Sequence, residues 1–307
     1  MPPRSDTWCQ TNTLSHRAFD PEALAEASTG PVSVCLPARN EAQTIGPIIQ
    51  ALIPLRECGL IDQLVVVDDS TDSTAEIAHS LGAEVHSQAS LMPELGPPRG
   101  KGDAMWRSLS VLRGELVCFL DADSEHFGPH FAYGLLGPLI TRPEISFVKG
   151  FYRRPFRMGS TTFPDGGGRV TELTARPLLN LFYPDLAAIE QPLAGEIAAR
   201  RSLFEGVPFV TGYGVDIALL IDAYRTVGLQ GLAQVDLDVR QNAHQPLADL
   251  GPMAYAVLHA VSTRLEREGR LRGPLPAGFA GPGSRVPASL TETPVERPPL
   301  ARLRPAA

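Results

Sequence analysis

Short runs of apolar residues alternate along the first half of the chain with segments in which apolar residues recur at helical spacing. The runs that predict strands are 32–36, 64–67, 84–86, 116–120 and 145–148. The segments that predict helices are 21–27, 45–55, 74–81, 102–112 and 131–140. Apolar strands that alternate with helices are typical of a parallel sheet covered on both faces. We therefore predict an α/β fold with a mostly parallel sheet flanked by helices.

The pattern changes in the second half and at both ends. Helical spacing recurs at 173–181, 217–227 and 252–268, which predicts a helical second half. The end of the chain is rich in proline and glycine and lacks periodicity, which predicts a mobile or wrapped tail. The predicted organisation is an irregular segment 1–30, one domain 31–270 with halves 31–125 and 126–270, and a tail 271–307.

Composition excludes several classes of protein. The 307 residues, 43% of them hydrophobic, are ample for a large core. The net charge of −7 argues against a nucleic-acid binder. The four cysteines have no C-x-x-C spacing, so neither a disulfide framework nor a zinc site is indicated. Because no apolar run approaches the ~20 residues that span a bilayer, and no signal peptide stands at the start, we expect a soluble, cytoplasmic protein without a membrane partner.

Two carboxylates follow the apolar strand at 116–120. Asp121 and Asp123 flank Ala122, so a buried strand delivers both to one edge of the sheet. Such a pair suits a divalent cation that holds a diphosphate, because hard cations prefer oxygen ligands and keep positions for substrate phosphates. A pair of this kind is common, however, and alone it could be two solvated acids in a turn.

Further polar segments accompany this pair. Residues 37–41 (Pro-Ala-Arg-Asn-Glu) follow the first strand, and 68–74, which starts Asp-Asp-Ser, follows the second. Residues 99–103 (Arg-Gly-Lys-Gly-Asp) open a helix, where backbone N–H groups and Lys101 could meet a phosphate. Open α/β sheets bind ligands at the carboxyl ends of their strands. Each segment alone could be a helix cap, a turn or a surface lysine, but those interpretations predict no particular order of motifs.

The order of these motifs resembles that of nucleotide-sugar glycosyltransferases of the GT-A fold, over roughly residues 31–270. Motifs of the second half look like family 81 of the retaining glycosyltransferases; they lie at 151–155, 166–173, 175–179, 191–196 and 212–217. The resemblance implies that a nucleotide sugar and a Mg²⁺ or Mn²⁺ ion are bound. The residues that it implies for the nucleotide sugar are Pro37, Ala38, Asn40, Glu41, Asp68, Asp69, Ser70, Lys101, Asp121, Ala122 and Asp123.

The resemblance also implies the reaction and the oligomer. Glucose would be transferred with retention, usually from UDP-glucose, to 3-phosphoglycerate, and the enzyme would be a homodimer. Two other donors stay open as alternatives: GDP-glucose, and GDP-mannose for a mannosyl transfer. The shape of the loops around the donor decides between them. A nucleotidyltransferase and a non-catalytic nucleotide-sugar-binding module are further alternatives. The former is expected to have a phosphate loop rich in Gly, Arg or Lys where this chain has residues 37–41.

An acidic, phosphorylated acceptor is consistent with the residues after the glycine-rich loop. Gly168, Arg169 and Thr171 offer N–H groups, a guanidinium and a hydroxyl, all donors suited to phosphate. The resemblance implies that they hold the phosphate or carboxylate of the acceptor; a plain turn with a surface arginine is the alternative. It also implies that Asp216 lies near the reacting centre, with Lys101 as the second catalytic residue. Family members often carry glutamate at position 216, and a helix-capping aspartate is the competing interpretation.

The resemblance leaves one metal ligand open. In the family, Asp123 would share the metal with a histidine in a sequence R-x-H-x-N, but residues 240–244 read Arg-Gln-Asn-Ala-His. The amide oxygen of Asn242 could ligate a hard cation. A shift of two residues could instead bring the imidazole of His244 to the metal, or His244 could touch only the acceptor or solvent. We expect His244 to be a metal or acceptor ligand.

Overall fold

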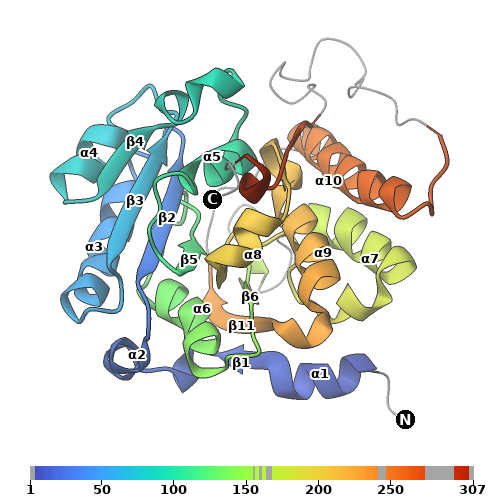
Figure 1. Ribbon diagram of the computed structural model, residues 1–307, viewed down its shortest axis with the longest axis horizontal. Helices are drawn as coiled ribbons and strands as arrows, with labels where there is room; N and C mark the ends of the chain where they lie inside the picture. The colour runs from blue at the N-terminus through green and yellow to red at the C-terminus, as the bar shows by residue number, and fades with distance from the viewer. Residues whose placement is uncertain are drawn as a thin grey trace.

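A mixed sheet forms the centre of the computed structural model, which describes residues 4–154, 156–158, 161–163, 168–240, 247–273 and 294–303 (Figure 1). Within these residues the sheet has eight strands in the order β1-β11-β6-β9-β5-β2-β3-β4. All neighbouring strands are parallel except that β9 runs antiparallel to β5 and β6. This confirms the predicted α/β fold with a mostly parallel sheet.

Most strands agree closely with the predicted runs. The sheet consists of β1 (Thr13–Ser15), β2 (Val32–Ala38), β3 (Gln63–Asp68), β4 (Glu84–Ser87), β5 (Leu116–Phe119), β6 (Phe147–Arg153), β9 (Ile197–Arg200) and β11 (Leu232–Val239). Two short pairs lie outside it: β7 (Phe156–Met158) with β8 (Thr161–Phe163), and β10 (Phe209–Val210) with β12 (Glu296–Arg297). Strand β2 continues through Pro37, beyond its predicted end. Its pairing with β5 ends at Cys35, so Pro37 pairs with β3 alone, where the sheet is paired on one side only.

Helices cover both faces of the sheet, and each face has its own core. Alternate strand residues point to opposite faces, for example Val34 and Cys118 to one and Cys35 and Val117 to the other. The first face is covered by α2 (Pro21–Ala27), α3 (Ile45–Glu57), α4 (Thr74–Ser80) and α6 (His130–Thr141). The second face is covered by α1 (Arg4–Asn12), α5 (Lys101–Ser108), α7 (Arg176–Phe182), α8 (Arg201–Gly206), α9 (Val215–Val227) and α10 (Leu247–Arg267).

The start of the chain is more regular than the irregular segment that the sequence indicated. Helix α1 is followed by β1, which pairs with β11 at the edge of the sheet. Trp8 is fully buried, and its Nε1 donates a hydrogen bond to the carbonyl of Leu232 at 3.2 Å. One buried aromatic side chain therefore anchors a polar helix, and a single apolar residue leaves no periodic pattern to detect.

Part of the C-terminal tail is wrapped against the domain, one of the two predicted alternatives. Strand β12 pairs with β10, and Leu300 in the short helix η8 (Leu300–Arg302) is 3% exposed. No helix among the described residues is long and apolar enough to cross a membrane. The expected cytoplasmic location and the division into halves at 125 and 126 stay predictions.

Candidate functional site

A pocket of about 330 Å³ opens at the carboxyl ends of β2, β3 and β5. It brings together four segments that the sequence singled out, namely those at 37–41, 68–74, 99–103 and 121–123. Its lining residues are Pro37, Ala38, Arg39, Glu41, Asp69, Gln88, Gly100, Lys101, Ala104, Asp121, Ala122, Asp123 and Tyr213. The position agrees with the edge at which open α/β sheets bind ligands.

Three residues expected at this pocket, namely Asn40, Asp68 and Ser70, instead form hydrogen bonds within and between the loops beside it. The backbone N–H of Asn40 donates to Ser70 Oγ at 2.8 Å, and the N–H of Thr71 donates to Asn40 Oδ1 at 2.9 Å. Asp68 accepts a hydrogen bond from the N–H of Ser70 at 3.2 Å. Asn40 adopts a φ of 60°, a left-handed conformation that asparagine tolerates better than most residues. The loops after β2 and β3 are therefore held as one unit, with Asn40, Asp68 and Ser70 outside the pocket lining.

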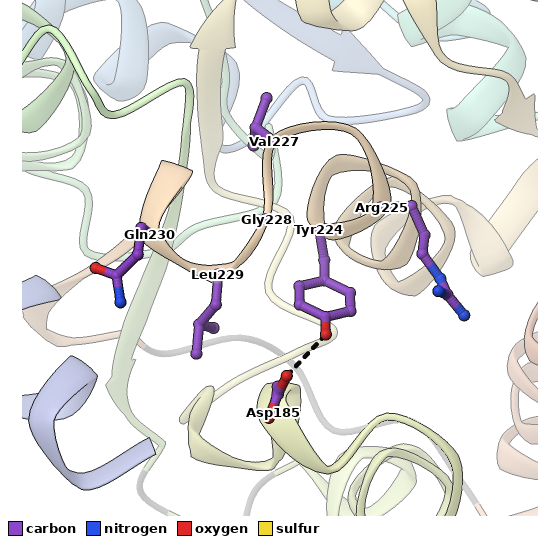
Figure 2. A pocket seen from close by; sticks show the side chains of 7 residues that line it. All are labelled: Asp185, Tyr224, Arg225, Val227, Gly228, Leu229 and Gln230. Carbon is purple, nitrogen blue, oxygen red and sulfur yellow. Dashed lines mark hydrogen bonds between the residues drawn. The ribbon is translucent and has the colours of Figure 1, made fainter. Parts of the chain in front are cut away.

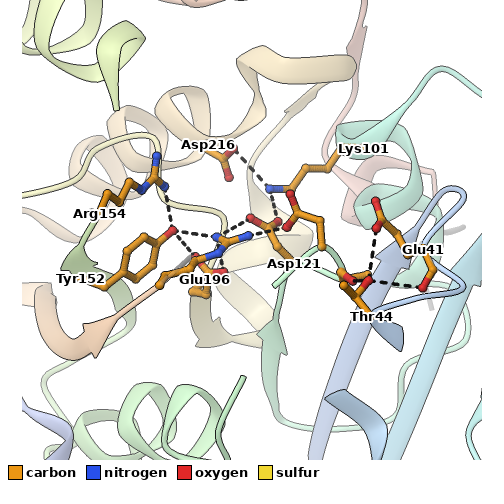
Figure 3. A network of polar contacts seen from close by, with 11 residues as sticks. Glu41, Thr44, Lys101, Asp121, Tyr152, Arg154, Glu196 and Asp216 are labelled. Atoms are coloured by element: carbon orange, nitrogen blue, oxygen red, sulfur yellow. Dashed lines mark hydrogen bonds and ion pairs between the residues drawn. The ribbon is translucent and has the colours of Figure 1, made fainter. Parts of the chain in front are cut away.

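Glu41 lies half-buried at the wall of the pocket (Figure 3). Thr44 Oγ1 donates to its Oε2 at 3.2 Å and to the carbonyl of Ala122 at 2.6 Å, which ties the first loop to the segment after β5. Burial, together with repulsion from Asp123, raises the pKa of Glu41 to about 7. Near neutral pH this carboxyl group can therefore donate a hydrogen bond as well as accept one.

Lys101 begins α5 and contacts two carboxylates rather than solvent alone (Figure 3). Its Nζ lies 2.6 Å from Asp121 Oδ1 and 3.5 Å from Asp216 Oδ2. Burial lowers the pKa of Lys101, but the two carboxylates outweigh this and raise it overall, so the ammonium stays protonated. Gly195 leaves the necessary room, because a Cβ there would clash with Asp121 Oδ1 and with Lys101 Nζ.

Arg240, which follows β11, joins three carboxylates. Its side chain is 2% exposed, and Nη1 donates to Asp121 Oδ2 at 2.9 Å and to Glu196 Oε1 at 2.5 Å. Its Nη2 donates to Asp123 Oδ1 at 2.5 Å. Burial opposes ionisation of Asp121, but Lys101 and Arg240 outweigh it and hold the pKa of Asp121 below its usual value. Asp121 is therefore ionised, and both acids of the pair already contact a fixed cation.

The network continues from Glu196 to Tyr152 and Arg154 (Figure 3). The hydroxyl of Tyr152 donates to Glu196 Oε2 at 2.8 Å and accepts from Arg154 Nη2 at 2.8 Å and from Arg240 Nη1 at 2.7 Å. Arg153 instead points to the surface and lies 3.7 Å from Asp238 with 67% of its side chain exposed. The two neighbouring arginines thus differ: Arg154 belongs to the site, and Arg153 forms an exposed ion pair.

Asp216 and Lys149 lie at the innermost part of the site. Asp216, in the first turn of α9, is 3% exposed; its Oδ2 faces Lys101, and its Oδ1 has no hydrogen-bond partner within the described ranges. Burial raises the pKa of Asp216, and Lys101 and Lys149 oppose that shift. Lys149 Nζ donates to the carbonyl of Ala194 at 2.7 Å, and burial lowers its pKa to about 8. The ion pair with Lys101 argues against a helix-capping role for Asp216.

The predicted acceptor residues stand beside the Tyr152–Arg154 end of this network. Gly168 has a φ of 75°, and a Cβ there would lie 3.9 Å from Arg154 Nη1. Thr171 is buried and begins a π-helical turn, η4 (Thr171–Ala175), while Arg169 is partly exposed. Gly168 is thus close enough to Arg154 for the residues that follow it to extend the polar network toward an acceptor.

A metal fits the carboxylates of this site, although the second protein ligand is not located. The two candidates, Asn242 and His244, lie outside the described residues, so the choice between them stays a prediction. No group of three or more His, Cys, Asp or Glu side chains within the described ranges is arranged to hold a metal. Asp121 and Asp123 nevertheless line the pocket with carboxylate oxygens, the donors that hard divalent cations prefer. These oxygens already accommodate a cationic group, the guanidinium of Arg240.

Four residues of the network were not singled out from the sequence: Lys149, Tyr152, Glu196 and Arg240. Tyr152 and Glu196 stand inside motifs that carried the family resemblance, and Arg240 opens the segment 240–244, but nothing local indicated that these side chains would join the network. Lys149 offers a clearer signal, because it is a lysine inside an apolar strand. A charge buried in a strand needs a partner, and that requirement points to a polar site nearby.

A second pocket, of about 710 Å³, lies at the end of α9 (Figure 2). Its lining residues are Asp185, Tyr224, Arg225, Val227, Gly228, Leu229 and Gln230. The hydroxyl of Tyr224 donates to Asp185 Oδ2 at 2.8 Å across it. None of the residues that the sequence singled out lines this pocket, so the candidate site is the smaller one.

Similarity to known proteins agrees with the motifs. Residues 33–169 match the family described as Glycosyl transferase family 2. The chain is 42% identical over 295 residues to the glucosyl-3-phosphoglycerate synthase of Mycolicibacterium smegmatis, a match that covers 96% of each chain. It is 45% identical over 251 residues to the synthase of the same name from Petrotoga mobilis, a match that covers 81% of this chain and 77% of that one.

Solved structures share the fold over nearly the whole length. Mannosyl-3-phosphoglycerate synthase from Rubrobacter xylanophilus superposes with a TM-score of 0.88 and 46% identity, covering 99% of both chains. Glucosyl-3-phosphoglycerate synthase from Mycobacterium tuberculosis, in complex with Mn²⁺, UDP-glucose and phosphoglyceric acid, gives a TM-score of 0.82 and 40% identity. That match covers 95% of this chain and 99% of the other.

Proposed function

The chain belongs to the family of the glucosyl-3-phosphoglycerate synthases, and on that premise we propose that it transfers glucose from UDP-glucose to 3-phosphoglycerate. The observation that carries the proposal is the position of Lys101. Its ammonium stands at the pocket wall between Asp121 and Asp216, at the start of a helix. A cation held there suits the diphosphate of a nucleotide sugar, because negative charge grows on that group as it departs.

The donor side of the site has the groups that this reaction needs. The wall that would hold the nucleoside consists of Pro37, Ala38, Arg39, Glu41 and Asp69, and Lys101 would face the diphosphate. Asp123, with a ligand from 242 or 244, would hold a divalent metal. A bound Mg²⁺ or Mn²⁺ supplies Lewis-acid stabilisation of the leaving diphosphate. Arg240 would have to share Asp123 with this ion, since it already donates to Asp123 Oδ1.

The acceptor side would hold 3-phosphoglycerate by its charges. Gly168, Arg169 and Thr171 offer donors to the phosphate or carboxylate, and Asp216 Oδ1 can accept a hydrogen bond from the free hydroxyl. That hydroxyl attacks the anomeric carbon on the face from which the diphosphate departs. The anomeric C–O bond to the diphosphate breaks, and a phosphate oxygen takes the proton of the hydroxyl, so the configuration is retained.

A mannosyl transfer from GDP-mannose is the second candidate function. It is favoured by the structure from Rubrobacter xylanophilus, which matches this chain at 46% identity. The two reactions share the acceptor and differ in the nucleotide base and in the orientation of one sugar hydroxyl.

Product analysis by NMR tests both candidates at once. The enzyme is incubated with 3-phosphoglycerate, a divalent metal, and UDP-glucose, GDP-glucose or GDP-mannose in turn. We expect an α-linked glucosyl-3-phosphoglycerate with UDP-glucose as the best donor. A β-linked product would contradict retention, and preferred turnover of GDP-mannose would select the mannosyl reaction. Absence of transfer with every donor would contradict the proposal.

The metal assignment is tested by Asp123→Ala. Half of the Asp123 side chain is exposed, so its loss should harm folding little. We expect Mn²⁺ binding, measured by calorimetry without substrate, to be lost together with turnover. Asp69→Ala is the matched control, since Asp69 lines the same pocket and should leave Mn²⁺ binding intact. Unchanged Mn²⁺ binding by Asp123→Ala would contradict the assignment.

We also propose that the chain forms a homodimer through an exposed apolar surface of η4, α7 and α10. Leu173, Leu181 and Leu258 are 78%, 72% and 43% exposed, and η4 packs against both α7 and α10. A second copy that covers this surface would remove them from water. Sedimentation velocity on the wild type and on Leu181→Glu measures this, and we expect a dimer that becomes a monomer in the variant. A monomeric wild type would contradict the proposal.

A further inference from the structure

The segment of residues 294–303 lies beside α5, which carries Lys101, and pairs with β10, which leads toward α9 and Asp216 (Figure 1). Strand β12 of this segment pairs with β10, and the N–H of Thr211 donates to the carbonyl of Val295 at 2.7 Å. In return the N–H of Val295 donates to Thr211 Oγ1 at 2.9 Å. Thr211 leads directly into the turn η6 (Gly212–Gly214), which precedes α9 and therefore Asp216.

A buried ion pair links the same segment to α5. Asp103, two residues after Lys101, is fully buried. Its Oδ2 accepts hydrogen bonds from Arg107 and from the N–H of Arg99, whereas its Oδ1 lies 2.6 Å from Arg297 Nε. A buried carboxylate is costly without a full set of partners. Arg297 therefore completes a site on which the first turn of α5 depends.

Further contacts fix the orientation of Arg297 and of its neighbours. Its Nη1 donates to the carbonyl of Leu95 at 3.0 Å, and its guanidinium lies 5.5 Å from the centre of the Trp106 ring. Trp106 Nε1 donates to the carbonyl of Pro298 at 2.8 Å. Glu296 in turn pairs with Arg267 of α10 at 2.5 Å. The segment thus connects α5, β10 and α10.

The two elements that the segment holds also touch each other. A Cβ on Gly100 would lie 3.5 Å from the Cα of Gly212, so the start of α5 and the turn η6 are in close contact. The ion pair between Lys101 and Asp216 bridges the same junction at 3.5 Å. Helix α5 has only 8 residues, and a helix this short depends on tertiary contacts for its position.

We propose that residues 294–303 form a clamp that positions Lys101 opposite Asp216, with Arg297 as its main positioning residue. The inference rests on the proposed function, because it concerns the geometry of transfer. Arg297 acts through Asp103 and α5 and touches no reacting atom. When it is lost, Lys101 is displaced from the place where charge develops on the departing diphosphate, so the chemical step slows more than acceptor binding does.

The test compares Arg297→Ala with Arg302→Ala, an exposed arginine of the same segment. We expect kcat of Arg297→Ala to fall by about ten- to a hundredfold, while KM for 3-phosphoglycerate changes by less than about twofold. Arg302→Ala should match the wild type in both. Arg297→Lys, which keeps a positive charge near Asp103 but loses the guanidinium contacts, should recover part of the lost kcat.

Folding is measured separately, so that a structural role is distinguished. A folded Arg297→Ala enzyme with a lowered Tm and an unchanged kcat would overturn the proposal, and so would an equal fall in Arg302→Ala. If Arg297→Ala does not fold, Thr211→Val replaces it, because it removes only the bond to the N–H of Val295; an unchanged kcat there would also overturn the clamp. The proposed function is tested separately by the activity of the wild type, because the clamp is judged only by kcat and KM of the variants relative to the wild type.

Discussion

On the nucleotide side of the pocket the loops after β2 and β3 are joined by hydrogen bonds, whereas on the opposite side buried charged side chains meet. Asn40 and Ser70 represent the first kind of contact. Arg240, Glu196 and Lys101 represent the second, with ion pairs largely shielded from water. Hydrogen bonds at a surface can be replaced by water, but a buried charge that loses its partner cannot be compensated. Substitutions on the two sides should therefore differ in size.

The largest effect is expected from Arg240→Met, which leaves Glu196 and Asp121 without the guanidinium between them. We expect the free energy of unfolding to fall by about 3–5 kcal/mol, as for other broken buried ion pairs. Urea unfolding at neutral pH measures it. Arg153→Met is the control, since this exposed ion pair should contribute about 0–1 kcal/mol. Equal losses in both variants would contradict the expectation that a buried ion pair is costlier to break than an exposed one.

Gly195→Ala is the next most severe change, and it acts on activity. The added Cβ would clash with Asp121 Oδ1 and Lys101 Nζ, so it must push both side chains from their places. We expect kcat to fall by about a hundredfold, because small displacements near the reacting atoms have effects of this size. Gly206→Ala is the control, since a Cβ there meets nothing within 4 Å. Steady-state kinetics that give the same kcat for both variants would contradict the tight packing around Gly195.

The buried side also predicts an unusual dependence of stability on pH. Burial lowers the pKa of Lys149 from 10.5 to about 8. Between these values the unfolded chain binds a proton that the folded chain lacks, so the free energy of unfolding rises with pH, by at most about 1.4 kcal/mol per pH unit. Below pH 8 Lys149 is charged in both the folded and the unfolded chain, so its burial lowers the free energy of unfolding by an amount that does not change with pH. Lys149→Met should be free of this slope, and urea unfolding at several pH values checks it; parallel pH profiles would contradict the shifted pKa.

The same comparison explains what the sequence could predict. The loops of the nucleotide side are local: each follows one apolar strand, so residues 37–41, 68–74 and 121–123 could be placed at one edge of a parallel sheet. The buried network could not be predicted, because its members come from distant strands. Glu196 lies near Asp121 because β9 is inserted antiparallel between β5 and β6. No local pattern indicates that register.

The contacts at both ends of the chain are hard to predict for a related reason. Trp8 and Arg297 each connect one of these segments to the domain through a partner that is distant in the sequence. Their partners, Leu232 and Asp103, lie 224 and 194 residues away in the sequence. Periodicity detects a face made of many residues and not one residue that fits a distant site, so both segments look irregular in the sequence.

The smallest effect should come from the nucleotide side itself, at Asn40. Its φ of 60° costs a residue with a Cβ about 1–2 kcal/mol, unless the side chain bonds locally as Asn40 Oδ1 does with the N–H of Thr71. Asn40→Gly loses the bond but adopts the conformation freely, so it should cost only about 0.5–1.5 kcal/mol. Asn40→Ala should cost more, because it loses both the bond and the tolerance of this conformation. Urea unfolding of the two variants measures the difference, and a more stable alanine variant would show that the left-handed conformation does not govern this loop.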